Sequence, residues 1–271
     1  MTNQSFMRLT ALDVNAADPS PNDPWCPRTL WEVAFGWSSG IDEPAPRTYL
    51  LLDGALRTKA AGTFDLDVLE LPARSLFQGV AAEDYASAAP YLLDLTPPTA
   101  WRDFGRFWGR QGSVVIRSHA TLDEMRSHLR RFTRMKRADT GAWALFRFWD
   151  ARVLLPYLEA LTDWPARAAS WTSPPGGPAI LSFVLEGDTE DEAWLVEPVA
   201  NAPTHPIKPG GPLSDREIAA LSNGAAMRFE RGLARGLSRL EPVDPAISHG
   251  QWMAFARAVV PEARAMGRRT Q

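Results

Sequence analysis

The sequence RTYLLLDG at residues 47–54 decides the fold expected for this chain. Its apolar run is the length of one buried strand and is flanked by polar residues. The run ends at Asp53-Gly54, where glycine accommodates the positive φ that a turn requires. We therefore predict a buried strand over 47–53 that is stopped by a turn.

Short apolar runs recur after this strand, and helical patterns lie between them. The further strands are predicted at 75–77, 91–93, 113–116 and 143–148. The clearest helix follows Thr121, which has capping-box spacing with Glu124 and precedes an apolar face ending at Phe132. A second helix is expected over 151–161. Residues 47–165 are therefore expected to form an α/β domain with a mixed sheet flanked by helices.

The two ends of the chain differ from this central part. Six prolines in residues 1–46 favour an irregular arm, with one short strand at Leu30 to Trp37. Residues 166–271 are predicted to form a hairpin, 180–185 paired with 193–196, and a C-terminal helical lobe packed on it. Ser214 and Glu217 have capping-box spacing at the start of that lobe. The predicted class is α+β.

The net charge is small but the charges are segregated along the chain. The 271 residues contain 29 basic and 32 acidic side chains, a net charge of −3, which gives no overall attraction to nucleic acid or anionic membrane. Residues 1–100 contain 6 basic and 13 acidic side chains, whereas residues 101–152 contain 12 basic and 5 acidic ones. The basic block 101–152 and the acidic segment 186–197 are candidate complementary surfaces, for each other or for partners.

Several classes of site have no signature in the sequence. Cys26 is the single cysteine, so an intramolecular disulfide and a cysteine-based zinc module are excluded. The four histidines lack metal-ligand spacing, and no Walker loop or dinucleotide-binding glycine motif is found. No secretory signal or apolar stretch of membrane length is visible. We expect no cofactor, no metal, no membrane contact and a cytoplasmic location.

Two chemical alternatives stay open. Ser118 and His119 could assemble a nucleophilic triad with Asp53 or Asp150, which would make the protein a hydrolase-like enzyme. Arg126 to Arg137 are spaced to lie on one face of the predicted helix, adjacent to its apolar face. This basic stripe could be a solvated face, or it could bind anions, nucleic acid or a protein. An acidic run in the hairpin loop could keep that loop soluble or bind a basic partner. The candidates for protein binding are Arg126, Arg130, Arg134, Arg137, Glu186, Asp188 and Glu190.

Six motifs in order resemble a known bacterial family. They are YLLLDGA at 49–55, SLFQG at 75–79, APYLLDL at 89–95, WG at 108–109 with IRS at 116–118, LDEMRSHLRRF at 122–132, and LFRFWDARVL at 145–154. The pattern resembles the type VI secretion effector adaptors, chaperones typically encoded beside a VgrG spike gene and a toxin gene. This chain departs from the family at Trp149, where the family has tyrosine, and at Ala151, where it has proline, so ring packing and the helix start there could differ.

The resemblance implies a non-enzymatic role. An adaptor of this family holds a toxic effector in the cytoplasm and places it on the VgrG spike, so the implied partners are the effector and VgrG, with no nucleic acid. The motif residues with expected structural roles are Asp53, Gly54, Phe77, Gly79, Phe146, Arg147, Phe148, Asp150 and Arg152. Among them, Asp53-Gly54 is assigned to a turn and the two Phe residues of 146–148 to the core. The charged residues of 147–152 are expected to form one ion-pair network between strand and helix.

Overall fold

The computed structural model describes residues 6–14, 17–36, 44–56, 71–96, 104, 107–109, 113–174, 177–187, 191–199, 211–237, 251 and 254–258. Its contacts divide the chain into two compact units, Met1–Ile218 and Ala219–Gln271. The second unit contains most of helix α8 (Asp215–Leu237) and the helical residues 254–258. Within that unit, Arg257 and Glu230 form an ion pair at 3.3 Å.

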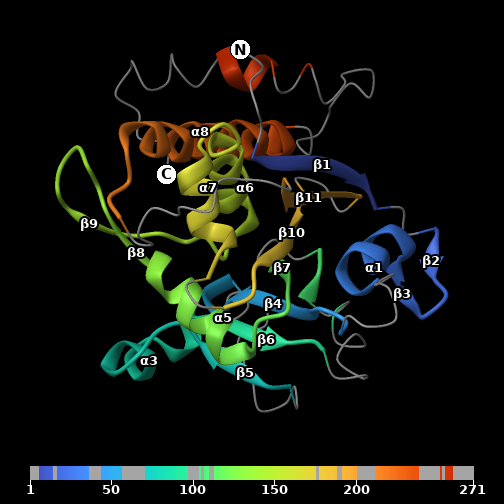
Figure 1. Cartoon of the computed structure of the whole chain (residues 1–271). Coiled ribbons are helices and arrows are strands. Elements are labelled where there is room, and N and C mark those ends of the chain that lie inside the picture. The colour runs from blue at the N-terminus through green and yellow to red at the C-terminus, as the bar shows by residue number, and fades with distance from the viewer. Residues whose placement is uncertain are drawn as a thin grey trace. The chain divides into compact units, whose positions relative to one another are not determined.

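The first unit is built on one seven-stranded sheet (Figure 1). In spatial order its strands are β1 (Met7–Asp13), β11 (Glu192–Pro198), β10 (Ile180–Glu186), β7 (Ser113–Ser118), β4 (Arg47–Asp53), β6 (Pro90–Asp94) and β5 (Ala73–Ser75). The predicted α+β class is confirmed. Every pair in this sheet is antiparallel, so the expected mixed sheet is wrong in that detail. Alternating strands and helices favour parallel neighbours, but here each strand lies beside strands that run in the opposite direction.

Strand β4 lies inside the sheet between β7 and β6, and its residues from Thr48 to Asp53 are buried. Because side chains alternate across a strand, Leu50 and Leu52 face one side and Tyr49 and Leu51 the other. Leu50 and Leu52 belong to a core cluster with Leu30 and other residues around α1. On the opposite face the Tyr49 hydroxyl donates to the Ala120 carbonyl at 2.5 Å, and burial raises the pKa of Tyr49. Both faces are therefore covered.

The N-terminal residues contribute regular structure that the sequence analysis missed. Besides the edge strand β1, they form the ribbon β2 (Pro19–Ser20) and β3 (Asp23–Pro27) and the helix α1 (Arg28–Phe35). The expected irregular arm is therefore wrong for these residues, and the expected strand at Leu30 to Trp37 is a helix over its described part. Leu30 and Ala34 are both buried, and their spacing of four residues places them on one helix face.

The C-terminal end of α1 is bound by a buried arginine on β7. The Arg117 guanidinium donates to the carbonyls of Val33 at 3.4 Å and Gly36 at 3.1 Å. Helix C-terminal carbonyls carry partial negative charge and lack partners within the helix, so a cation is favourable there. Burial lowers the pKa of Arg117 to about 10.

Helices α5 (Leu122–Leu129), α6 (Ala151–Ala160) and α7 (Pro165–Thr172) pack on the sheet, with α5 against β5 and β6, α6 against β10 and β1, and α7 against β10 and β11. In Figure 1, α6 and α7 lie on the side of the strands away from α1. The α5 capping box is confirmed, since Thr121 accepts from the Glu124 backbone amide at 3.3 Å and its own amide donates to Glu124 at 2.7 Å. The hairpin predicted from 180–185 and 193–196 is also confirmed, as β10 paired with β11. Because β10 also pairs with β7, this hairpin is part of the main sheet.

Aromatic rings fill the space beneath these helices. Phe132, on the 3-10 turn η3 (Arg130–Phe132), stacks on Trp171 of α7 with ring centroids 3.9 Å apart. Phe146 and Phe148 pack against the same Trp171 at 6.0 and 5.4 Å. His128 Nε2 contacts the Trp171 carbonyl oxygen at 2.7 Å, and burial lowers the pKa of His128 to about 4. The imidazole is therefore neutral near pH 7, with Nε2 as the donor.

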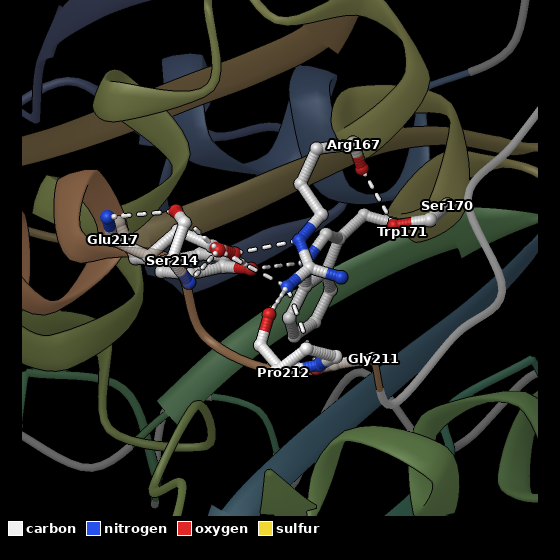
Figure 2. A network of polar contacts seen from close by, with 8 residues as sticks. Arg167, Ser170, Trp171, Gly211, Pro212, Ser214 and Glu217 are labelled. Atoms are coloured by element: carbon white, nitrogen blue, oxygen red, sulfur yellow. Dashed lines mark hydrogen bonds and ion pairs between the residues drawn. The ribbon is translucent and has the colours of Figure 1, made fainter. Parts of the chain in front are cut away.

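A buried ion pair fixes the start of α8 to α7 (Figure 2). Arg167 Nε donates to Glu217 Oε1 at 2.6 Å, and both side chains are almost completely buried. Tyr157 also donates to Glu217 at 2.6 Å, and the Ser214 amide donates to it at 2.8 Å. Burial opposes ionisation of Glu217, but these hydrogen bonds outweigh it and lower the pKa of that carboxyl. The Ser214–Glu217 capping box predicted from the sequence thus forms part of a larger network.

Short elements border the edge of the sheet near β5. They are α3 (Val80–Asp84), the 3-10 turn η2 (Ala86–Ala88), and the ribbon of β8 (Arg134–Lys136) and β9 (Trp143–Leu145). The expected strand over 143–148 stops at Leu145, because the chain turns at 148–150 to start α6. None of the helices within the described ranges is both long and apolar enough to cross a membrane.

Candidate functional site

A groove of about 630 Å³ lies between the end of β4, the loop after β5, α3, η2, η3 and the β8–β9 ribbon. Four segments distant in sequence contribute to it. Its lining residues are Asp53, Ala55, Leu76, Phe77, Gln78, Ala81, Tyr85, Ala88, Arg130, Thr133, Arg134, Leu145, Arg147 and Trp149. The lining combines a mainly apolar surface with three arginines.

Among the described lining residues Asp53 is the only acidic one, and its side chain is 1% exposed. Oδ2 accepts hydrogen bonds from Trp149 Nε1 at 3.0 Å and from Arg147. Oδ1 accepts from the backbone amides of Ala55 at 3.0 Å and Leu56 at 3.3 Å. Four donors therefore satisfy a carboxylate whose burial would otherwise be very costly. These bonds make Asp53 a structural centre of the groove.

Gly54 follows Asp53 at a close approach between two backbone segments. Its amide donates to the Ala89 carbonyl at 3.0 Å, and a Cβ on Gly54 would lie 2.5 Å from that oxygen. A side chain therefore does not fit without moving the backbone. The glycine is required here for this contact. The expected turn with a positive φ is wrong, since the φ of Gly54 is not positive and residues 54–56 are helical.

The motif at 75–79 forms another wall. Phe77 makes an edge-to-face contact with Trp149, with ring centroids 6.2 Å apart, and its amide donates to Ser75 Oγ at 3.1 Å. Gly79 precedes α3 with φ of 56°, a backbone region that favours glycine. The Phe77 contact and the Gly79 backbone conformation therefore fix the position at which α3 begins beside the groove.

The basic stripe does not lie on one helix face, which corrects the sequence-based interpretation. Helix α5 ends at Leu129, and Arg134 lies on β8, where Met135 is buried between two exposed neighbours. This alternation is the two-residue period of a strand, so the helical spacing does not continue past Phe132. Arg137, just after β8, is bound by Asp139 at 2.5 Å and does not line the groove.

Two arginines fix the end of β5 and the loop after it by donating hydrogen bonds to backbone carbonyls. Arg126 Nε donates to the Ser75 carbonyl at 2.7 Å, and Arg130 Nε donates to the Leu76 carbonyl at 3.2 Å. Partial burial and the neighbouring Arg126 charge lower the pKa of Arg130. In the part of the chain that the structure describes, Arg126, Arg130 and Arg134 form no ion pair with a carboxylate.

The expected single network of Arg147, Asp150 and Arg152 is instead two separate pairs. Arg147 binds Asp53, whereas Arg152 Nε donates to Asp150 at 2.9 Å. Asp150 also accepts from the Arg152 amide at 3.0 Å as the N-cap of α6, so the helix starts at Ala151 without the family's proline. The hydrogen bond that Arg152 donates to Asp150 raises the pKa of Arg152, and the charges of Asp150, Asp53 and Glu186 add to this effect.

The acidic candidates for protein binding do not form an exposed surface among the residues that the structure describes. Glu186 lies at the end of β10 and is 6% exposed, so the expected exposed position is wrong for it. Its strand register places it opposite Ala193 inside the sheet. Asp188 and Glu190 lie outside the described residues.

The groove does not bring together the residues of the hydrolase alternative. Asp53 lines it, but Ser118, His119 and Asp150 do not. Ser118 is buried, where its hydroxyl donates to the Ala179 carbonyl at 2.9 Å and accepts from the Ala120 amide at 3.1 Å. Among the residues with described positions, no group of three or more His, Cys, Asp or Glu could hold a metal ion.

Exposed apolar side chains on and beside the groove were missed by sequence reasoning. Tyr85, Leu145, Val80 and Trp143 are each more than half exposed. Arg134 lies over the Trp143 ring at 5.5 Å. Val80, Tyr85 and Trp143 lie between the motifs, whereas Leu145 begins the last motif. Local periodicity does not show which apolar residues stay at the surface.

The groove and its supporting strands define an α+β domain with an arginine-bearing apolar groove. Residues 48–168 match the family model described as a domain of unknown function, DUF4123, so the chain contains a DUF4123 domain. No match was found among curated proteins or among solved structures. All groove-lining residues lie within the matched range, whereas β1, β10 and β11 of the same sheet lie outside it.

Proposed function

We propose that this protein is a non-enzymatic adaptor of type VI secretion, which binds a toxic effector in the cytoplasm and loads it onto the VgrG spike. The observation that carries this proposal is that the groove is formed mainly by the motif residues. Most of its lining comes from four of the motifs that resemble the adaptor family: 49–55, 75–79, 122–132 and 145–154. The resemblance and the binding surface thus coincide on the same residues.

The surface chemistry supports protein binding. Exposed tyrosine, tryptophan and arginine side chains concentrate binding energy in protein interfaces, and all three types occur here as Tyr85, Trp143 and Arg134. Large exposed apolar side chains gathered around a groove are also typical of interaction sites. An adaptor needs such a surface and no reacting group.

Co-purification tests the proposal. The full-length protein, tagged and co-expressed with the product of an adjacent large toxin gene, should form a stable complex with that toxin. Deleting the adaptor gene should prevent loading of the toxin onto VgrG, and restoring the gene should reverse the loss. A toxin that reaches VgrG equally well without the protein would refute the adaptor role.

The ionic-strength dependence of the complex adds a second readout. If the arginines meet carboxylates of the partner, raising the salt from low to high concentration should weaken association, because mobile ions screen intermolecular charge. A complex held by apolar contacts alone would not weaken in this way.

A further inference from the structure

We propose that the groove binds a short segment of the partner polypeptide in which apolar side chains are interspersed with carboxylates. This inference rests on the proposed function only for the identity of the partner, the effector. The occupant follows from two features of the groove, its apolar walls and its uncompensated arginines.

The apolar lining comes from separate segments of the chain. Leu76, Phe77 and Trp149 form one continuous surface through the Phe77–Trp149 edge-to-face contact. Tyr85 is 59% exposed and Leu145 is 55% exposed, although both line the groove. Covering these side chains would remove apolar area from water, which favours an occupant with apolar side chains of its own.

The charge of the lining favours an acidic occupant. Three arginines, Arg130, Arg134 and Arg147, face one carboxylate, Asp53, so the described lining residues carry a net charge of +2. Asp53 is already bound by four donors, and its charge is buried beneath Trp149 and Arg147. Arg134 is exposed and has no carboxylate partner among the described residues. The planar arginine fork suits carboxylates of a peptide, which it can bind through two parallel hydrogen bonds.

The same features favour a polypeptide over nucleic acid. Leu76, Ala81, Ala88 and Leu145 give the groove aliphatic walls, whereas single-stranded nucleic acid needs stacking rings along a continuous basic track. Arg137 would extend the basic track beyond the groove, but Asp139 binds it. A basic track does not continue there.

Peptide selection on the full-length protein tests the proposal. The probe is a displayed library of random peptides of about twelve residues, a length that extended recognition segments commonly use. Enriched peptides should combine aromatic or leucine residues with Asp or Glu. A synthetic enriched peptide should bind the protein in solution, and its version with Asn and Gln in place of Asp and Glu should bind at least about tenfold more weakly.

Two pairs of variants locate the binding. Ala81→Trp fills the groove from the exposed side of α3, and Val80→Trp adds the same ring on that helix outside the groove lining. Arg134→Glu reverses a charge of the lining, and Arg131→Glu makes the same change at an exposed arginine outside it. Ala81→Trp and Arg134→Glu should weaken peptide binding at least about tenfold, and their controls should leave it within about twofold. Circular dichroism checks that all four variants fold.

The outcomes separate this inference from the proposed function. Enrichment of basic or uncharged peptides, no enrichment, or equal effects of each variant and its control would overturn it. Preferential binding of a single-stranded oligonucleotide with the same variant pattern would also overturn it in favour of nucleic acid. A toxin complex that survives Ala81→Trp unchanged would leave the adaptor role intact and refute the groove as its site. Peptide binding in the groove without any toxin complex would support the groove as a peptide site and refute the adaptor role.

Discussion

The indole Nε1 of Trp149 donates a hydrogen bond to Oδ2 of Asp53 at 3.0 Å, across 96 positions of sequence. This bond ties the end of β4 to the segment between β9 and α6. It also places the Trp149 ring against Phe77 of the loop after β5. The contact therefore joins three of the segments that shape the groove.

Trp149→Phe tests the structural weight of this hydrogen bond. Phenylalanine keeps a ring in the core but removes one donor from a buried carboxylate, so we expect the free energy of unfolding to fall by about 1–3 kcal/mol. Urea unfolding followed by circular dichroism measures the change. Stability equal to that of the unsubstituted protein would show that the remaining three donors suffice.

Gly54→Ala tests the backbone approach to Ala89. Because the new Cβ would lie 2.5 Å from a carbonyl oxygen, the backbone must shift, and we expect a loss of about 1–3 kcal/mol. Gly232→Ala is the control, since a Cβ there meets nothing within 4 Å on α8 and should stabilise that helix by up to about 1 kcal/mol. Thermal melts of both variants should move in opposite directions.

His128 gives the protein a defined acid sensitivity. Its pKa is about 4 in the folded protein and 6.5 in the unfolded chain, so between these values the unfolded state binds the additional proton. Stability is therefore full above pH 6.5 and decreases as the pH falls toward 4, by a total on the order of 3 kcal/mol from this group. His128→Gln, which keeps a donor for Trp171, should flatten the dependence of unfolding free energy on pH in that window. Equal slopes for the two proteins would contradict the assignment.

The Arg167–Glu217 pair is expected to behave as a coupled unit. Glu217→Gln leaves a buried cation without its counter-ion, and we expect a loss of about 3–5 kcal/mol. Arg167→Met leaves the opposite charge unpaired. The double variant should lose clearly less than the sum of the two single losses, as measured in a double-mutant cycle by urea unfolding. Additive losses would argue against direct coupling.

The parts of the fold that the sequence predicted are those with strong local patterns. The apolar run of β4, the Thr121–Glu124 capping box and the β10–β11 hairpin all follow from neighbouring residues. The antiparallel direction of the sheet and the position of β1 at its edge depend on long-range pairing, which local periodicity does not encode.

The candidate site was predicted only in fragments. Asp53, Phe77 and Arg147 could be singled out from motifs, but their meeting in one groove depends on contacts between distant segments. The Arg126 to Arg137 spacing favoured a helix, and the change to a strand at Arg134 follows from its pairing with Leu145. Arg167, whose partner lies 50 positions away, had no sequence signal that distinguished it from a surface arginine.

Amide hydrogen exchange of the full-length protein, with and without a purified toxin that co-purifies with it, tests the central claim most directly. If the groove holds a segment of the toxin, binding should slow exchange in Leu76–Tyr85 and Thr133–Arg147, and Ala81→Trp should abolish that protection while Val80→Trp preserves it. Protection confined to other segments, with exchange in these two unchanged, would contradict the account.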